Sequence, residues 1–145
     1  MVQYKTGIVV FMLQLSKKVE YGLIALRHMA MNPRGQVFTA KEIAVNYDIS
    51  YELLAKVLQK LTKARVVIST QGMHGGYSLA KRPNELRVSS IISIIEEEKP
   101  TIAECYGEDG ENCSIFDACT IRKPLGKMQH NLNLLLDNTT LEQIV

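Results

Sequence analysis

Two short helices joined by a three-residue turn constrain the fold of this 145-residue chain more than any other feature. Thr39-x-x-Glu42 is a capping box, in which two side chains bond the free backbone N–H groups at the start of a helix. Tyr47-Asp48-Ile49 then forms a tight turn, and Ser50 is suited to cap a second helix. The apolar face of this second helix consists of Leu54, Val57, Leu58 and Leu61. Two capped helices at this spacing predict a helix-turn-helix.

A β-hairpin is predicted immediately after the second helix. The β-branched run Val66–Thr70 is followed by the glycine-rich turn Gln71–Gly76 and then by Tyr77–Ala80. Strand, turn and strand in this order indicate a hairpin. A hairpin that follows a helix-turn-helix directly is a wing, and Lys81 and Arg82 place positive charge at its end. The predicted fold class is therefore mainly α with a small β-hairpin wing.

Three more helices are predicted around this motif. Ser16 can cap a helix whose apolar residues recur at helical spacing up to the break at 32–35. Ser89–Glu98 has the pattern of a largely buried helix, and Pro124 suits the first turn of a long final helix. The apolar stripe of the final helix consists of Leu125, Met128, Leu132, Leu135 and Leu136. A small domain offers little to cover this stripe, so we expect a dimerisation helix that pairs with a second copy.

Charge is distributed unevenly along the chain. Residues 1–99 hold 14 Lys and Arg against 8 Asp and Glu, whereas residues 100–145 hold 3 against 7. A basic amino-terminal part suits a polyanion such as DNA, and an acidic carboxyl-terminal part does not. An ordinary solvated surface would give the same balance, so charge alone leaves both interpretations open.

All three cysteines lie in the acidic part, in the pattern Cys105-x7-Cys113-x5-Cys119. Thiolates are soft ligands that bind iron–sulfur clusters, zinc or copper(I). Structural zinc sites usually use Cys-x2-4-Cys knuckles, and these gaps are too open for that. The spacing favours a larger object with several irons, although three unligated cysteines would also fit it.

The odd number of cysteines also bears on the compartment. An exported disulfide scaffold usually has an even set, so a reducing, cytoplasmic location is expected. The apolar run Gly7–Leu13 is too short to span a bilayer and lacks the flanks of a cleaved signal peptide, so no membrane association is expected. No Ser/His/Asp set, paired carboxylates or phosphate loop is present, which argues against an enzyme with a small-molecule substrate.

Four segments together resemble a known family. They are Leu15-Ser16-Lys17-Lys18-Val19-Glu20-Tyr21-Gly22-Leu23, the turn His74-Gly75-Gly76-Tyr77, the three-cysteine segment, and Thr139-Thr140-Leu141-Glu142-Gln143-Ile144-Val145. The chain from about Leu15 to its end is similar to the iron–sulfur winged-helix transcriptional regulators typified by IscR, NsrR and RirA. The cysteine spacing is closer to RirA and NsrR than to IscR.

The resemblance implies a homodimeric transcription factor, usually a repressor, with an iron–sulfur cluster bound by Cys105, Cys113, Cys119 and one other ligand. In IscR that ligand is a His three residues after the last Cys; here the position is Arg122, which stays protonated and cannot bind a metal. In NsrR-like members it is a carboxylate at the start of the first helix of the partner subunit. The matching residue is Glu20, and this ligand set favours 4Fe–4S over 2Fe–2S. As a plain helix residue, Glu20 would instead be a solvated acid near a favourable helix start.

The predicted function is DNA-binding regulation that responds to nitric oxide, redox state or iron status, on a palindromic site in double-stranded DNA. Residues expected to face bases are Tyr51, Glu52, Ala55 and Gln59, and those expected to contact phosphate are Lys56, Lys60, Lys63, Lys81 and Arg82. Ser50, Gln71 and His74 complete the expected DNA-binding face. Gln71 replaces the Arg that normally opens the family's wing, which weakens the expected minor-groove contact.

The expected organisation has four segments: an amino-terminal extension (1–14), a winged helix-turn-helix (15–99), a cysteine loop (100–121), and a dimerisation helix with a cap (122–145). The first eleven residues have no counterpart in the family. Two other functions remain open at this stage. One is a winged-helix regulator that uses its cysteines as a cluster-free thiol or zinc switch, and the other is an electron-transfer or scaffold protein.

Overall fold

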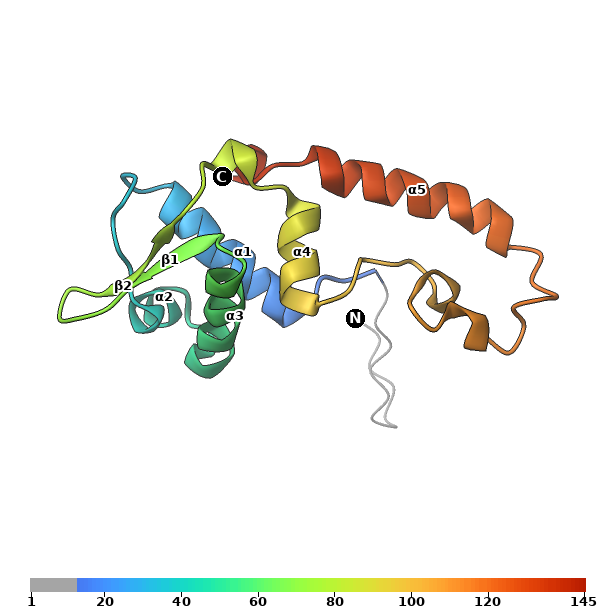
Figure 1. Ribbon diagram of the computed structural model, residues 1–145, viewed down its shortest axis with the longest axis horizontal. Coiled ribbons are helices and arrows are strands. Elements are labelled where there is room, and N and C mark those ends of the chain that lie inside the picture. The colour runs from blue at the N-terminus through green and yellow to red at the C-terminus, as the bar shows by residue number, and fades with distance from the viewer. Residues whose placement is uncertain (1–12) are drawn as a thin grey trace.

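The computed structural model describes residues 13–145, so most of the amino-terminal extension and its apolar run lie outside the described residues. The helices and strands are α1 (Lys17–Ala30), α2 (Ala40–Tyr47), α3 (Tyr51–Lys63), β1 (Val67–Thr70), β2 (Gly76–Leu79), α4 (Val88–Glu96) and α5 (Arg122–Asn138). Short 3-10 turns are η1 (Pro83–Glu85), η2 (Glu104–Tyr106), η3 (Gly110–Asn112) and η4 (Leu141–Ile144). Figure 1 shows two regions: α1–α4 and the hairpin form a head, and α5 extends away from it. We call residues 13–99 and 139–145 the head and residues 100–138 the arm.

The three predicted helix starts are confirmed by their capping bonds. The Ser16 hydroxyl accepts a hydrogen bond from the Val19 N–H at 3.3 Å, and the Ser50 hydroxyl accepts one from Leu53. At the start of α2 the Thr39 hydroxyl accepts from the Glu42 N–H at 3.0 Å, while the Glu42 carboxylate accepts from the Thr39 N–H at 2.6 Å. These bonds satisfy N–H groups that have no partner within the helix, which fixes where α1, α2 and α3 begin.

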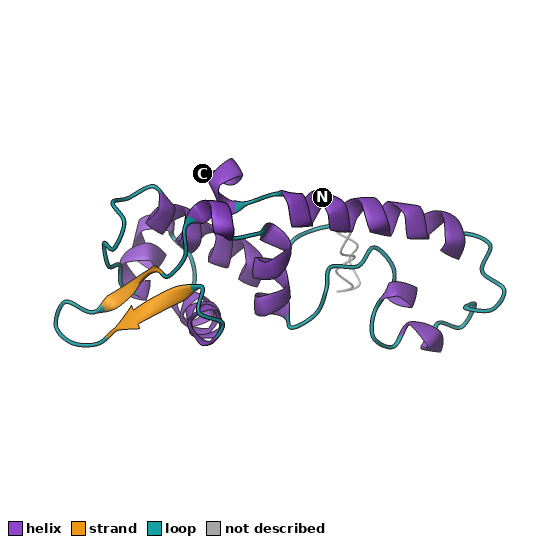
Figure 2. Cartoon of the chain, turned by 45° about the horizontal axis from the view of Figure 1, so that its top comes forward, coloured by secondary structure: helices purple, strands orange, loops and turns teal. Residues whose placement is uncertain are grey.

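The predicted wing is present as an antiparallel hairpin. β1 pairs with β2 in a register that runs from Val67 opposite Leu79 to Thr70 opposite Gly76. Phe38 and Tyr77 exchange backbone hydrogen bonds of 2.9 and 2.7 Å, which tie the hairpin to the segment before α2. In Figure 2 the turn of the hairpin and the cysteine loop lie at opposite ends of the long axis. The parts expected to read DNA and to hold a metal are therefore well separated.

The hydrophobic core lies entirely in the head. Its fully buried side chains include Leu26 of α1, Ile43 of α2, Leu58 of α3 and Ile91 of α4. Leu141, near the end of the chain, is also 0% exposed. The chain returns to the head after α5, and backbone bonds from Val88 to Thr139 and from Leu141 to Leu86 hold it there.

Two boundaries differ from the sequence-based expectation. The predicted helix 89–98 is α4 at Val88–Glu96, because Glu97 adopts a left-handed conformation (φ 63°) that ends the helix. The segment expected as loop before Cys113 contains the turns η2 and η3. Among residues 13–145, no helix is long and apolar enough to cross a membrane.

The apolar stripe of α5 is divided between two rows. Leu125, Leu132 and Leu136 are half-buried, and Leu136 packs against the core of the head. Met128 and Leu135 are 56% and 63% exposed, and Ile121 continues their row at 55%. The five residues predicted for dimerisation therefore do not share one free face, and the exposed row is spaced every seven residues.

Candidate functional site

The outer face of α3 is polar and exposed. Nearly all of the residues expected there are solvent-accessible: Ser50, Tyr51, Glu52, Lys56, Gln59 and Lys63. Ala55 is half-buried between them. The opposite face holds Leu54, Val57, Leu58 and Leu61, all at most 1% exposed. The strong separation of the two faces leaves the polar face of α3 exposed to solvent, as is expected of the second helix of a helix-turn-helix.

Lys60 is the exception on this helix. Sequence reasoning gave it a phosphate contact, but its ammonium lies against the end of α4. The Nζ atom donates to the Ile95 carbonyl at 2.9 Å and lies 3.7 Å from a Glu97 carboxylate oxygen. The Lys60 side chain is therefore directed toward the end of α4, and it is only 34% exposed.

The wing contributes a second exposed polar surface. Gln71 and His74 lie in its turn, and Lys81 and Arg82 follow β2; all four are exposed. Met73, which is also in the turn, is 94% exposed. A bond from the Gly75 N–H to the Gly72 carbonyl closes the turn. The expected wing residues therefore surround a compact turn, with positive charge at its base.

The three cysteines lie at three separate places in the cysteine loop (100–121). Cys105 is in η2, Cys113 caps the carboxyl end of η3, and Cys119 precedes α5. All three are half-buried, and none forms a disulfide. A Cβ at Gly110 would collide with the backbone of Cys105, so only glycine allows η3 to pack this closely on η2. The thiols are therefore partly accessible on a loop with some internal packing.

Contacts from α5 hold the cysteine loop at both ends. The amide of Gln129, which is 7% exposed, accepts from the Ile102 N–H at 2.8 Å and donates to the Pro100 carbonyl at 3.0 Å. On the other side the Tyr106 hydroxyl donates to the Arg122 carbonyl. The Arg122 guanidinium lies 4.0 Å from the centre of the Phe116 ring, a cation–π contact. Arg122, which cannot bind a metal, thus has a packing role in the loop.

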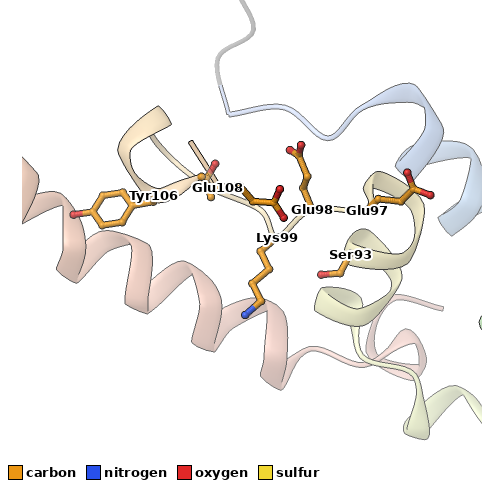
Figure 3. A pocket seen from close by; sticks show the side chains of 8 residues that line it. Ser93, Glu97, Glu98, Lys99, Tyr106 and Glu108 are labelled. Atoms are coloured by element: carbon orange, nitrogen blue, oxygen red, sulfur yellow. The ribbon is translucent and has the colours of Figure 1, made fainter. Parts of the chain in front are cut away.

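A cleft of about 530 Å³ separates the loop from the end of α4. Its lining includes Glu97, Glu98 and Lys99 on one side and Tyr106 and Glu108 on the other (Figure 3). The cleft marks the place where the head ends and the arm begins, and no sulfur lines it.

Glu20 lies in the first turn of α1, in the head. Its carboxylate forms an ion pair with Lys17 at 2.7 Å, and its side chain is 42% exposed. The hydrogen bond from Lys17 to Glu20, and then the charge of Glu20, raise the pKa of Lys17. Within one chain, Glu20 therefore has the environment of a solvated acidic residue in the first turn of a helix, paired with a lysine.

The three cysteine thiols have the chemistry of iron–sulfur ligands, but they do not converge on a common site in this structure. Three reduced thiols on a 15-residue segment are the ligands that such clusters use. Yet among residues 13–145 no group of three His, Cys, Asp or Glu side chains is close enough to share a metal ion. Sequence spacing predicted the ligand types, and it does not fix the loop conformation that would bring them together.

Comparison with known proteins decides the family. The Rrf2 family model, described as iron-dependent transcriptional regulator, matches residues 15–145. The chain belongs to the Rrf2 family. An Rrf2 relative, the HTH-type transcriptional regulator NsrR of Oceanobacillus iheyensis, is 30% identical over 133 residues, which cover 92% of this chain and 90% of that protein.

Solved Rrf2-like structures share the fold. CymR, the global cysteine regulator of B. subtilis, superposes with a TM-score of 0.70 at 26% identity and covers 92% of this chain and 96% of its own. The IscR of T. potens has the same TM-score and identity, with 91% and 85% covered. The winged-helix fold and the assignment as a transcriptional regulator are thereby confirmed, and the resemblance noted from the motifs is correct.

One residue with a clear structural role could not be identified from the sequence. Gln129 stands where the inner row of α5 should be apolar, between Leu125 and Leu132, and that break in the stripe was the available signal. His28 forms a hydrogen bond with the Tyr47 hydroxyl at 2.8 Å and packs edge-on against Phe38, so its role is in packing. His74 and His130 are both exposed.

Proposed function

We propose that this Rrf2 protein is a homodimeric repressor that binds a palindromic DNA site and senses nitric oxide, redox state or iron status through Cys105, Cys113 and Cys119. The observation that carries the proposal is the pairing, on one chain, of an exposed recognition face with three free, half-buried thiols in a separate arm. Because the thiols lie in the arm, a signal there would have to be transmitted to the head, either through the chain's own contacts or through a ligand from the partner subunit.

DNA binding is assigned to the outer face of α3 and to the wing. Tyr51, Glu52 and Gln59 are exposed where base edges would be met, with Ala55 among them. Positive charge for phosphate comes from Lys56, Lys63, Lys81 and Arg82. In a dimer two such faces would stand about 34 Å apart, which is one turn of DNA, so the operator would be palindromic.

Dimerisation is assigned to α5. Ile121, Met128 and Leu135 expose apolar surface at every seventh position, which a second α5 would cover. Leu125, Leu132 and Leu136 support the helix from its inner side. Glutamate in place of Met128 should dissociate the dimer, and sedimentation would show a monomer that keeps its helical spectrum. The exposed Asn131→Glu is the matched control and should remain dimeric.

The cofactor is assigned as an iron–sulfur cluster, 4Fe–4S in preference to 2Fe–2S, held by the three cysteines and by Glu20 of the partner subunit. Such a cluster would supply a centre that reacts with nitric oxide or oxygen. This chain would present three thiols on a loop that contacts α5 through Gln129 and Arg122. Binding or loss of the cluster would then move the loop relative to the head. A coupling of about 1–3 kcal/mol would change DNA affinity roughly 5- to 150-fold.

Protein purified without oxygen tests this assignment. We expect iron and acid-labile sulfide in the protein, and Cys113→Ala should lose both while the neighbouring Ser114→Ala retains them. Glu20→Ala should speed the decay of the visible spectrum on exposure to air, whereas Asp137→Ala, which removes an exposed acid elsewhere, should not. Protein without iron and sulfide that still changes its DNA affinity on thiol oxidation would instead establish a cluster-free thiol switch; zinc in their place would establish a zinc-stabilised regulator.

A further inference from the structure

The ammonium group of Lys60 completes the end of α4. It lies on α3, but its Nζ atom donates to the Ile95 carbonyl at 2.9 Å, and its side chain is only 34% exposed. The last carbonyls of a helix have no partner within the helix, and a cation near them also offsets the negative end of the helix dipole. Lys60 therefore links the recognition helix to a specific atom of α4.

Ile95 is the point at which three helices meet. Its side chain is 0% exposed. A Cβ built on Gly22 of α1 would lie 2.5 Å from the Ile95 side chain and 3.1 Å from Val57 of α3, so the contact exists only because residue 22 is glycine. Packed side chains of this kind cannot shift independently, and a movement of Ile95 would displace both neighbouring helices.

The same end of α4 is where the arm begins. Ser16, the cap of α1, donates to the carboxylate of Glu96, and Glu97 turns the chain in a left-handed conformation. Pro100 and Ile102 are then held by Gln129 on α5, and Cys105 follows three residues later. The path from the first thiol to the end of α4 is thus short and anchored on both sides.

We infer that Lys60 is a positioning residue that couples the state of the cysteine loop to the recognition helix. The inference rests on the proposed function, because it assumes that DNA affinity depends on the state of the thiols. When the end of α4 is held, the bond to Ile95 fixes the carboxyl half of α3 against it. When the loop displaces that end, the bond is lost and α3 is free to change its angle on DNA.

Two substitutions and one control separate this role from a phosphate contact. Lys60→Met removes the charge and the donor while it keeps the length of the side chain, and Lys60→Arg restores both. Lys63→Met removes the same charge from the exposed face of the same helix. The probe is a duplex selected by the wild-type protein from a randomised pool. Each dissociation constant is measured at several salt concentrations, for iron-loaded protein prepared without oxygen and for the same protein after treatment with a chelator.

The decisive quantity is the ratio of the larger to the smaller of the two dissociation constants, one for the iron-loaded protein and one for the chelator-treated protein. Lys60→Met should lower this ratio by about 2- to 30-fold, the range in which single residues alter coupling. Its salt dependence should equal that of the wild type, and Lys60→Arg should recover the ratio. Lys63→Met should weaken binding equally in both states, with a salt slope that is lower by about 1.

Three outcomes would overturn the inference. A Lys60→Met protein that behaves as Lys63→Met does, with weaker binding in both states and a lower salt slope, makes Lys60 a phosphate contact. A lower melting temperature with an unchanged ratio makes it a structural cap only. If the wild-type protein binds DNA equally tightly in both states, there is no effect for Lys60 to transmit. The proposed sensing then fails as well, whereas in the first two results only the role of Lys60 fails.

Discussion

The head and the arm differ in how much of their surface the chain itself covers. Every residue of the hydrophobic core belongs to the head, including Leu141 at the far end of the sequence. In the arm only Gly110 and Gln129 are buried, although the arm spans residues 100–138. Apolar side chains such as Leu135 remain 63% exposed there. The same chain thus contains one region that buries its own core and one that does not.

The difference shows which contacts stabilise each region. The head gains it from contacts within the chain, because burial of apolar side chains is the dominant favourable contribution to folding. The arm is held by a few polar bonds, such as those of Gln129, and by its attachment to the head. Contiguous exposed apolar surface of this kind is typical of an interaction site. The arm is therefore the region whose order we expect to depend on a partner copy or a ligand.

The largest expected effect compares two leucines, one in each region. Leu58→Ala removes a side chain that is 0% exposed in the head and should lower the free energy of unfolding by about 2–5 kcal/mol. Leu135→Ala in the arm should change it by about 0.5 kcal/mol or less in a monomer. Urea unfolding at two protein concentrations measures both, and a dependence of the Leu135→Ala effect on concentration would reveal the dimer contribution. Equal losses in dilute protein would contradict the division into two regions.

The next effect tests the polar attachment of the arm. Gln129→Leu leaves the Ile102 N–H and the Pro100 carbonyl without their partner, at a local cost of about 1–3 kcal/mol. Hydrogen exchange at the Ile102 amide should become faster, while exchange in α3 stays as it was. Asn131→Leu, an exposed change on the same helix, is the control. Unchanged exchange at Ile102 would show that Gln129 does not anchor the loop.

A smaller effect of opposite sign is expected at the boundary between the regions. Glu97 adopts φ 63°, a conformation that glycine takes without strain. Glu97→Gly should therefore raise the free energy of unfolding by about 0.5–1 kcal/mol, since the strain relieved is partly offset by the greater freedom of glycine in the unfolded chain. Thermal unfolding measures the gain. A loss instead would mean that the pairing with Lys60 matters more than the backbone strain.

The smallest effect concerns acid stability of the head. Hydrogen bonds from the Thr39 backbone and side chain lower the pKa of the Glu42 carboxyl. A lowered folded-state pKa stabilises the fold above the unfolded value of about 4.3, and that contribution is lost as the pH falls through the folded value. Glu42→Gln should cost about a few tenths of a kcal/mol at pH 7, because the group is exposed. Unfolding curves of the two proteins should converge at low pH, and a gap that persists there would exclude the charge as its cause.

The fold of the head could be predicted because its signals are local. Thr39 with Glu42, Ser16 and Ser50 each set a helix start within a few residues, and the hairpin followed from β-branched runs around a glycine-rich turn. The exposed face of α3 was predictable for the same reason, since periodicity alone separates it from the buried face. The direction of the Lys60 side chain could not be predicted, because a neighbour 35 residues away in the sequence, Ile95, decides it.

For the arm, the residue types and the long helix could be predicted, but the conformation of the cysteine loop could not. The cysteine pattern indicated the ligand chemistry, but the turns that carry the thiols depend on contacts such as Tyr106 with Arg122, which no local pattern encodes. The stripe of α5 was identified as a unit, whereas its inner and outer rows are distinguished only by how α5 sits on the head. Its expected role in dimerisation, the ligand role of Glu20 and the DNA contacts stay predictions.

The position of Leu141 has a consequence for protein quality control. The head lacks part of its core until the ribosome has passed the cysteines and the whole of α5, because Leu141 of η4 is fully buried in it and bonded to Leu86. A product cut short before η4 by a nonsense codon or a protease would lose Leu141, and with it part of the core of the head. We therefore expect a fragment that lacks the proposed sensing segment to have a destabilised head and to bind DNA weakly.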